Sequence, residues 1–243
     1  MLTDDERVRY SRQMAMPDFG EDGQQKLKNA HVFIAGAGGL GGTISLYLAA
    51  AGIGNLRIVD RDMVELSNLN RQLLFHSQSI GSDKAYLAQQ KLQQLNPCVN
   101  IEGLVDTIQE DNVNQLVTGF DVIVDALDNY PTRYLLNQAA LDLNVIFIHG
   151  SVHGMDGMIT TIIPQQTACL RCVFADSLPP AKTPVLGVTP GVIACLQALE
   201  TIKYIIGTGE LLTNRLLLFN GFDMRFTEMK LRRDPNCPDC GDK

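Results

Sequence analysis

The sequence predicts an α/β protein with a Rossmann-like, mostly parallel sheet and helices on both of its faces. Between residues 32 and 148, short apolar runs alternate with longer patterns of helical period, which is typical of parallel strands joined by covering helices. A glycine-rich turn joins the first apolar run to the first helical pattern, as in nucleotide-binding sheets. Beyond residue 150 the rhythm changes, and we expect antiparallel carboxyl-terminal strands there together with a zinc clip.

The first half of the chain supplies five strand candidates and four helix candidates. The strands are expected at residues 32–36, 56–60, 100–105, 120–126 and 144–150. The helices are expected near residues 40–51, 84–95, 111–117 and 131–143. In the second half we expect a strand at 157–164, an irregular proline-rich segment at 173–191, a helix at 191–206 and strands at 214–221 and 224–233.

Composition and charge argue against several classes of function. The formal net charge is −7, which disfavours a nucleic-acid partner because phosphate binding usually leaves a basic surface. The most apolar segment contains Gln197, Glu200 and Lys203, so it predicts a buried or interfacial helix rather than a membrane span. The charged amino terminus lacks the apolar core of a secretory signal. We therefore expect a cytoplasmic protein without membrane contact, in which the cysteines stay reduced.

Residues 36–41 match the G-x-G-x-x-G pattern that binds nucleotide phosphates. Gly36 permits the tight turn, Gly38 lets the backbone approach a ligand, and Gly41 allows close packing of the helix. Free N–H groups and the helix dipole at this end attract anionic oxygens. Asp60 ends the next strand, where its carboxylate can accept hydrogen bonds from ribose hydroxyls. These features predict nucleotide binding and leave both NAD and ATP open.

The segment that follows favours a triphosphate. Polar side chains crowd residues 61–75, namely Asp62, Asn68, Asn70, Arg71 and Gln72. Arg71, with Lys84 at the start of the next predicted helix, supplies two cations for phosphate charge. Asp125 and Asp128 follow the fourth strand at the carboxyl edge, where a carboxylate can hold a magnesium ion that bridges phosphates. Taken singly these charges are equally typical of helix caps and solvated loops, but their shared edge favours a binding site.

Two C-x-x-C pairs predict a structural zinc site. They are Cys169 with Cys172 and Cys237 with Cys240. Four thiolates complete a tetrahedral zinc and leave no open position for a substrate. The long separation of the pairs means that the metal would pin the carboxyl terminus to a distant loop and stabilise the fold. A redox pair and free thiols are the alternatives.

The order of these motifs resembles one family. The stretches RYSRQ, GAGGLG, VDRDMVELSNLNRQ, the lysine at 84, DALDNYPTR, CLRC, GVIACLQALETIKY and PNCPDCG follow one another along the chain. Over nearly its whole length the chain resembles the adenylyltransferases related to ubiquitin-activating enzymes, the ThiF/MoeB/HesA family that activates sulfur-carrier proteins. The same similarity places zinc at the four cysteines.

The resemblance implies a set of site residues. It places contacts to ATP or Mg²⁺ at Gly39, Asp60, Ser67, Asn68, Leu69, Asn70, Arg71, Lys84, Asp128 and Asn129. We add Gly36, Gly38, Gly41 and Asp62 from the pattern of the chain. Arg12 matches the arginine that, in the family, reaches into a neighbouring subunit's site, which implies a homodimer. We assign catalytic roles to Arg12, Arg71, Lys84 and Asp128.

The implied reaction is ATP-dependent adenylation of the carboxyl-terminal glycine of a small ubiquitin-like sulfur carrier ending in Gly-Gly. The carrier would be of the molybdopterin-synthase small-subunit type or the thiamine type, and pyrophosphate would leave. A carboxylate is already ionised near neutral pH, so its attack on the α-phosphate needs no general base. On this interpretation residues 1–243 form one ThiF-type domain, with a helical arm (1–30), a nucleotide-binding half (31–150) and a half for carrier binding and the zinc clip (151–243).

A separate protein is expected to deliver the sulfur. In some relatives a cysteine in the loop corresponding to residues 173–190 attacks the adenylate, but this chain has no cysteine between Cys172 and Cys195. Cys195 stands among apolar residues and Cys98 stands beside a proline, so we predict that both are packing residues. No rhodanese-like domain is expected after Lys243.

Three other functions stay open on the sequence alone. An NAD-dependent oxidoreductase would use the same glycine turn. An adenylating relative would act on a tRNA nucleoside or a peptide carboxyl terminus, although the acidic balance disfavours the former. A noncatalytic scaffold would keep the zinc clip, but it has no physical need for Arg71, Lys84 and Asp128 at one edge.

Overall fold

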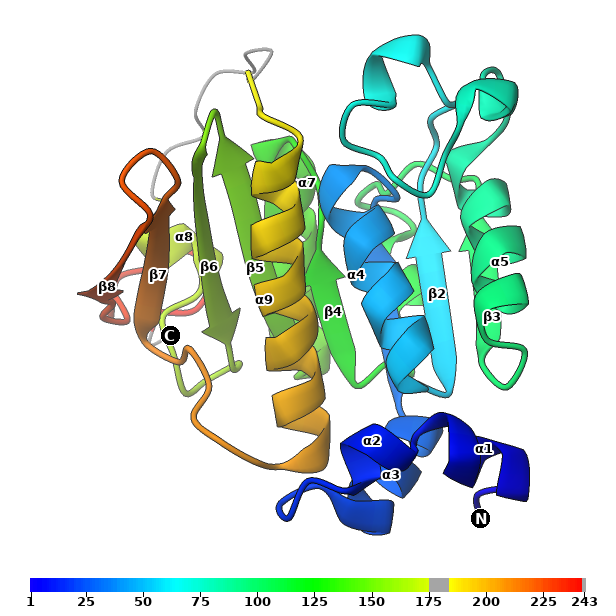
Figure 1. The fold of residues 1–243 in the computed structure, drawn as a ribbon. Coiled ribbons are helices and arrows are strands. Elements are labelled where there is room, and N and C mark those ends of the chain that lie inside the picture. Colours follow the sequence, from blue (N-terminus) through cyan, green and yellow to red (C-terminus); the bar gives the residue numbers. More distant parts are fainter. Residues whose placement is uncertain (175–183, 242–243) are drawn as a thin grey trace.

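The computed structural model describes residues 1–174 and 184–241 of the 243-residue chain and contains one eight-stranded sheet (Figure 1). The strand order is β3-β2-β1-β4-β5-β6-β7-β8. The strands are β1 (His31–Ala35), β2 (Asn55–Val59), β3 (Asn100–Leu104), β4 (Val122–Asp125), β5 (Ile146–His153), β6 (Asp156–Ile162), β7 (Arg215–Asn220) and β8 (Arg225–Lys230). This architecture confirms the predicted fold class.

The sheet is parallel from β3 to β5 and antiparallel from β5 to β8. The chain moves outward through β1, β2 and β3, and then returns to place β4 on the other side of β1. Such a reversal leaves a crevice between the loops at the carboxyl ends of the two strands, which is where open α/β sheets bind ligands. The fold therefore directs attention to the loops that follow β1 and β4.

Helices cover both faces of the sheet (Figure 1). One face carries α4 (Gly39–Ala51), α5 (Lys84–Leu95) and α9 (Val188–Ile206), and the other carries α6 (Val113–Val117), α7 (Tyr130–Leu143) and α8 (Leu170–Val173). Alternate residues of β1 enter the two cores: Val32 and Ile34 face the first group, whereas Phe33 and Ala35 face the second. Among the described residues, no helix combines the length and apolar character that crossing a membrane requires.

The remaining helices lie at the two ends of the strands. The short helices α1 (Asp4–Arg9), α2 (Ser11–Met14) and α3 (Gly20–Asn29) lie below the amino ends of the strands in Figure 1. The 3₁₀ turns η1 (Leu66–Asn68) and η2 (Ser77–Ser79) belong to the long connection between β2 and α5, above the opposite end.

Several boundaries differ from the sequence prediction for local reasons. Helix α9 begins at Val188, three residues earlier than expected, because Pro190 occupies the first turn, where a missing N–H breaks no helical hydrogen bond. Strand β6 ends before Pro164, which cannot donate to a sheet ladder. Strand β8 begins only at Arg225, because Met224 before it has a positive φ of 54° and is not in an extended conformation.

The amino-terminal arm is held to the sheet domain by buried polar contacts. Asn96 Nδ2 donates to Tyr10 Oη at 2.7 Å, and Gln13 Nε2 donates to the Ala51 carbonyl at 2.8 Å. Between these two anchors Arg12 is exposed. Tyr10 and Gln13 of the RYSRQ motif are therefore bonded to the rest of the chain, whereas Arg12 between them faces solvent in the single chain.

The glycine turn after β1 has no space for larger residues. Gly36 adopts φ +98°, and a Cβ there would lie 2.9 Å from the Ala126 carbonyl oxygen. A Cβ on Gly41 would lie 1.8 Å from the Gly36 carbonyl oxygen. Such contacts are far inside van der Waals distance, so both positions require glycine.

We predict that Gly41→Ala prevents the turn from closing and lowers the free energy of unfolding by about 3 kcal/mol or more. Urea denaturation measured by circular dichroism checks this. Gly191→Ala is the matched control: it lies within α9, and a Cβ there meets nothing within 4 Å, so it should be neutral or stabilising by about 0.5–1 kcal/mol. Equal midpoints for the Gly41 variant and the unmodified chain would contradict the prediction.

Candidate functional site

The candidate site lies at the carboxyl edge of the parallel strands, where the loops after β1 and β4 meet. The contact of Gly36 with Ala126 brings these loops together at the reversal of strand order. Gly38 is the N-cap of α4 and has no side chain to cap the helix. The amino-terminal N–H groups of this 13-residue helix and its dipole therefore favour an anionic ligand.

The connection from β2 to α5 adds a cation beside the glycine turn. A Cβ on Gly39 would lie 3.4 Å from Arg71 Cγ and 3.2 Å from Pro190 Cγ. Arg71 is half-buried, and its Nη1 donates to the Ser67 carbonyl and to Asn70 Oδ1. The start of α9 thus packs against the same turn, a neighbour that nothing in the sequence pattern predicted.

The polar residues before Arg71 mostly support their own turn. Asn68 is buried, and its Oδ1 accepts the Glu65 N–H at 3.1 Å. Ser67 Oγ donates to Glu65 Oε2 at 3.1 Å. Leu69 is half-buried. The side chains predicted here as ligands therefore lie together, and three of them, Ser67, Asn68 and Asn70, have local structural partners.

Gln72 also lies against the glycine turn. A Cβ on Gly38 would lie 3.6 Å from Gln72 Nε2. The side chain is 5% exposed, and within the described residues its Oε1 has no hydrogen-bond partner. Buried amide oxygens are normally bonded, so this one suits a ligand or an ordered water at the turn.

Asp60, Asp62 and Lys84 form a connected network of hydrogen bonds and an ion pair beside the turn. The Ala37 N–H donates to Asp60 Oδ2 at 2.7 Å, and the Asp62 N–H donates to Asp60 Oδ1 at 2.8 Å. Burial raises the pKa of Asp60 despite these donors. Each carboxylate oxygen keeps a second acceptor site, so contact with a ribose hydroxyl stays geometrically open.

Lys84 approaches this network from the first turn of α5. The side chain is buried, and its Nζ lies 3.2 Å from Asp62 Oδ2. Asp62 itself is exposed. The ion pair therefore holds a buried ammonium group beside an exposed carboxylate at the carboxyl edge.

The loop after β4 separates the two aspartates that the sequence grouped together. Asp128 is exposed and has no hydrogen-bond or ion-pair partner among the described residues. Asn129 is the N-cap of α7, and its Oδ1 accepts the Thr132 N–H at 3.0 Å. Asp125 is completely buried, so the expectation that it is a magnesium candidate like Asp128 was wrong.

Asp125 belongs to a buried network. Arg133 Nε lies 3.1 Å and His149 Nδ1 lies 2.6 Å from Asp125 Oδ2. Burial opposes ionisation of Asp125, but these neighbours outweigh that effect and hold its pKa below the usual range. Sequence periodicity gives no signal for Arg133 and His149, because a buried charge is identified only by its partners.

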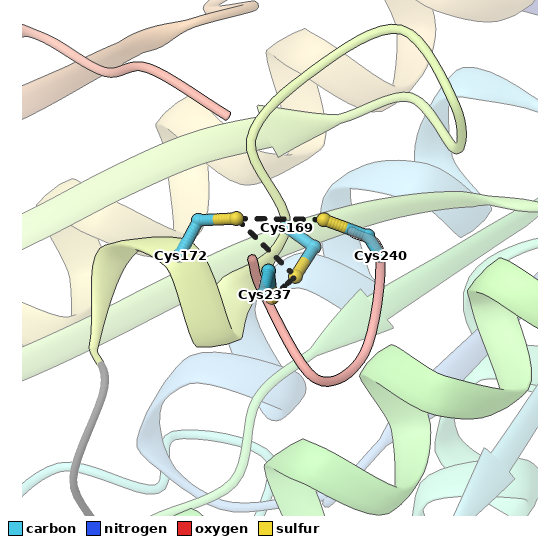
Figure 2. A group of neighbouring side chains, drawn as sticks. All are labelled: Cys169, Cys172, Cys237 and Cys240. Atoms are coloured by element: carbon cyan, nitrogen blue, oxygen red, sulfur yellow. Dashed lines mark hydrogen bonds between the residues drawn. The ribbon is translucent and has the colours of Figure 1, made fainter. Parts of the chain in front are cut away.

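The four paired cysteines converge from two distant segments (Figure 2). The Sγ atoms of Cys169 and Cys172 are 3.9 Å apart, those of Cys169 and Cys237 are 3.6 Å apart, and those of Cys172 and Cys240 are 3.4 Å apart. Four sulfurs bound at about 2.3 Å around one tetrahedral ion are separated by about 3.8 Å. The cluster therefore fits a tetrahedral metal site and is too open for disulfides.

A buried asparagine links the two halves of this cluster. Asn137 Oδ1 accepts the Leu170 N–H at 2.9 Å, and Asn137 Nδ2 donates to Asp239 Oδ2 at 3.0 Å. Arg171 Nε lies 3.4 Å from the same Asp239 oxygen. Protein contacts thus orient both C-x-x-C segments, and the sequence motif did not reveal the asparagine.

The other two cysteines are exposed. Cys195 lies on an outward face of α9, and Cys98 lies on the surface after α5. The expectation that both are packing residues was wrong, because α9 buries positions such as Ile193, Ala194 and Gln197 while turning Cys195 outward. The loop from 173 to 190, considered for a reactive cysteine, lies partly outside the described residues.

Arg12 is the predicted site residue that one chain does not bring to the edge. It lies on α2, below the amino ends of the strands, whereas the glycine turn lies at their carboxyl ends (Figure 1). Any contact between Arg12 and this type of site would have to be made with a second chain.

A doubly wound sheet with an open helix amino terminus, two cations and an exposed carboxylate at its reversal point defines a nucleotide-binding α/β protein. Comparison with known proteins shows that the chain belongs to the ThiF family, whose model matches residues 10–239.

Individual relatives match most of the chain. It is 40% identical to the sulfur carrier protein adenylyltransferase of Thermus thermophilus, with 99% of this chain and 93% of that protein covered. It is 41% identical to the SAMP-activating enzyme E1 of Haloferax volcanii, with 96% and 88% covered. A crystal structure of E. coli MccB with ATP is similar with a TM-score of 0.86 and 25% identity, over 96% of this chain and 75% of that chain.

The buried network predicts a stability loss in mild acid. Burial lowers the pKa of His149 below its ordinary 6.5, so below that pH the unfolded state binds a proton that the folded state does not. The free energy of unfolding should therefore fall on acidification, by up to about 1.4 kcal/mol per pH unit from this residue. Urea unfolding across this range measures the slope.

His149→Asn should flatten this slope while keeping a donor toward Asp125. His153→Asn changes an exposed histidine of the same strand and should leave the slope unchanged. An identical slope in the His149 variant would refute the assignment.

Proposed function

We propose that this protein is an ATP-dependent adenylyltransferase that activates the carboxyl-terminal glycine of a small ubiquitin-like sulfur carrier. The observation that carries the proposal is that two cations stand beside the glycine turn at the start of α4: Arg71 lies against Gly39, and Lys84 pairs with Asp62, which is bonded to Asp60 beside Ala37. This set neutralises more negative charge than a dinucleotide pyrophosphate requires. The similarity to enzymes named for sulfur carrier adenylation and SAMP activation supports the substrate class.

The proposed step is a displacement at the α-phosphate of ATP. One oxygen of the carrier's ionised carboxylate forms the new P–O bond, while the bond from that phosphorus to the bridging oxygen of pyrophosphate breaks. No proton moves, so no general base is needed. The products are a carrier acyl-adenylate and pyrophosphate.

Each edge residue has a defined role in this proposal. Arg71 and Lys84 offset the charge that builds on the phosphates, and the α4 amino terminus binds phosphate oxygens through backbone N–H groups. Asp60 accepts from the ribose. Asp128, free of protein partners among the described residues, would hold Mg²⁺, which supplies charge neutralisation to the phosphates when bound.

A homodimer would complete the site. Arg12 is exposed on a docked arm at the far end of the chain's own sheet, so it can act only on a partner's nucleotide. Helix α9 also exposes apolar residues, with Val188 at 67% and Leu199 at 53%. Both features support a paired assembly in which Arg12 acts between subunits.

We infer that the four-cysteine cluster holds a structural Zn²⁺. Its ligand set of four thiols and its sulfur spacing suit zinc, and no position is left for a substrate. Burial raises the pKa of Cys172 to about 11, an effect that a bound cation would offset. Such thiols are maintained in a reducing compartment, which supports a cytoplasmic location.

The sulfur would come from a separate donor protein. The sequence lacks a cysteine between Cys172 and Cys195, so the loop from 173 to 190 offers no thiol nucleophile. Cys195 is exposed and stays the one nearby alternative in the chain; a thiol-sensitive carrier conjugate on it would overturn the proposal of a separate sulfur donor.

A peptide or tRNA nucleoside is the alternative substrate for the same adenylation chemistry.

We predict that Asp128→Ala and Arg71→Ala each lower carrier-dependent ATP–pyrophosphate exchange by about 100-fold or more, because each removes charge stabilisation at the phosphates. The assay uses purified small carriers ending in Gly-Gly. Asp142→Ala, an exposed acid at the other end of α7, should keep full exchange. Normal exchange in both site variants, with native circular dichroism, would end the assignment.

Metal analysis tests the clip. The purified chain should contain about one zinc per chain, since four thiols complete one tetrahedral site. Cys172→Ser and Cys237→Ser should lose the metal and unfold at lower temperature. Cys98→Ser removes an exposed thiol elsewhere and should retain both properties. Full zinc content in the two cluster variants would exclude this site.

A further inference from the structure

The peptide group of Leu127 is held from both sides by the buried ion pair of Asp125 and Arg133. The Leu127 N–H donates to Asp125 Oδ1 at 3.0 Å. Arg133 Nη2 donates to the Leu127 carbonyl at 2.5 Å. The two charged side chains also face each other, with Arg133 Nε 3.1 Å from Asp125 Oδ2. One ion pair therefore fixes both polar groups of a single loop residue.

The surroundings fix the ion pair in turn. Arg133 Nη2 also donates to the Gly150 carbonyl at 3.2 Å, and His149 Nδ1 lies 2.6 Å from Asp125 Oδ2. Asp125 is fully buried and Arg133 is 4% exposed. From α9, Gln197 Nε2 donates to the Asp125 carbonyl at 2.8 Å. Strands β4 and β5 and helices α7 and α9 thus converge on the base of one loop.

The residue that follows this clamped peptide is Asp128. Its side chain is exposed, and among the described residues it has no partner that could fix it. On its other side, Asn129 caps α7 through its bond with the Thr132 N–H. The backbone of Asp128 is therefore fixed at both neighbours while the carboxylate is left available.

A buried ion pair is a weak means of stabilisation, because the loss of hydration roughly cancels the attraction. The fork of an arginine, by contrast, bonds several acceptors in fixed directions. Mg²⁺ demands near-ideal octahedral geometry, and a misplacement of about 1 Å can cost about 100-fold in rate. Fixed geometry at Asp128 is therefore worth more to the reaction than to the fold.

We propose that Asp125 and Arg133 are positioning residues that hold the Asp128 carboxylate in the orientation the adenylation step requires. Neither residue touches the substrates; they act through the Leu127 peptide. This inference rests on the proposed function, since the reaction is what makes the placement of Asp128 matter.

The kinetic test uses Arg133→Lys in the full-length chain. Lysine keeps a positive charge beside Asp125 but lacks the planar fork that reaches both the Leu127 and Gly150 carbonyls. In ATP–pyrophosphate exchange with the same purified carriers, kcat should fall about 30-fold while KM for ATP changes less than about threefold. The free Mg²⁺ needed for half-maximal exchange should rise about tenfold.

A double-variant cycle shows whether Arg133 acts through Asp128. If it does, Arg133→Lys should cause no further loss, within about twofold, once Asp128→Ala is present. If instead the losses of the two single variants multiply in the double variant, Arg133 acts independently of Asp128 and the proposal is overturned. Glu200→Gln is the structural control, because Glu200 is also a buried acid, on α9, but its partners are Thr161 Oγ1, the Leu212 N–H and Lys203 Nζ rather than the Asp125–Arg133 pair; it should leave kcat and the Mg²⁺ requirement unchanged.

A second measurement keeps the proposal testable without turnover. Amide hydrogen exchange of Leu127, whose N–H donates to Asp125 Oδ1, should accelerate at least about tenfold in the double variant Asp125→Asn/Arg133→Gln, which removes both charges and leaves none buried alone. The Glu200→Gln chain should show no change at this amide. Unchanged exchange in the double variant would show that Asp125 and Arg133 do not fix the Leu127 peptide.

The outcomes separate the two proposals. An unmodified chain that shows no ATP–pyrophosphate exchange with any carrier would count against the proposed function. The amide measurement would still decide whether Asp125 and Arg133 fix the Leu127 peptide. Normal kcat and Mg²⁺ dependence in Arg133→Lys, in an active enzyme, would overturn the positioning role alone.

Discussion

The contact between the glycine turn and the loop after β4 is the constraint on which the nucleotide edge depends. Gly36 lies against the Ala126 carbonyl, and Gly41 lies against Gly36, so two segments far apart in sequence meet without intervening side chains. The reversal of strand order places both at the carboxyl edge of the sheet, where open α/β sheets bind ligands. Backbone donors from the first segment and a carboxylate from the second can therefore face the same phosphates.

Below this edge the molecule uses buried polar groups where an apolar core would serve stability as well. The ion pair of Asp125 and Arg133 supports the loop of Asp128, and Asn137 supports both cysteine segments. Arg133 and Asn137 lie one turn apart on α7. This single helix thus connects the nucleotide edge to the candidate metal site, and both depend on its fixed packing against the sheet.

The long connection between β2 and α5 and the start of α9 enclose the glycine turn from the other side. Pro190 lies against Gly39, and a Cβ on Gly187 would meet the Asn70 carbonyl oxygen at 2.0 Å. Arg71 is consequently held between two segments, whereas Asp128 is held from below by its own loop. The arginine and the exposed carboxylate of the proposed site therefore rest on separate supports, so each can be altered without removing the other.

The fold class and most of the candidate edge could be predicted from the sequence because they depend on local patterns. Alternating apolar runs, the glycine spacing, the polar residues from Asp60 to Arg71 and the two C-x-x-C pairs each carry their meaning within a short stretch. The structure decided what depends on distant partners. It separated buried Asp125 from exposed Asp128, turned Cys98 and Cys195 to the surface, and revealed Arg133, His149 and Asn137. A hydrogen bond or an ion pair between remote segments leaves no periodic trace along the chain, so only the packed sheet and helices could show which polar residues meet.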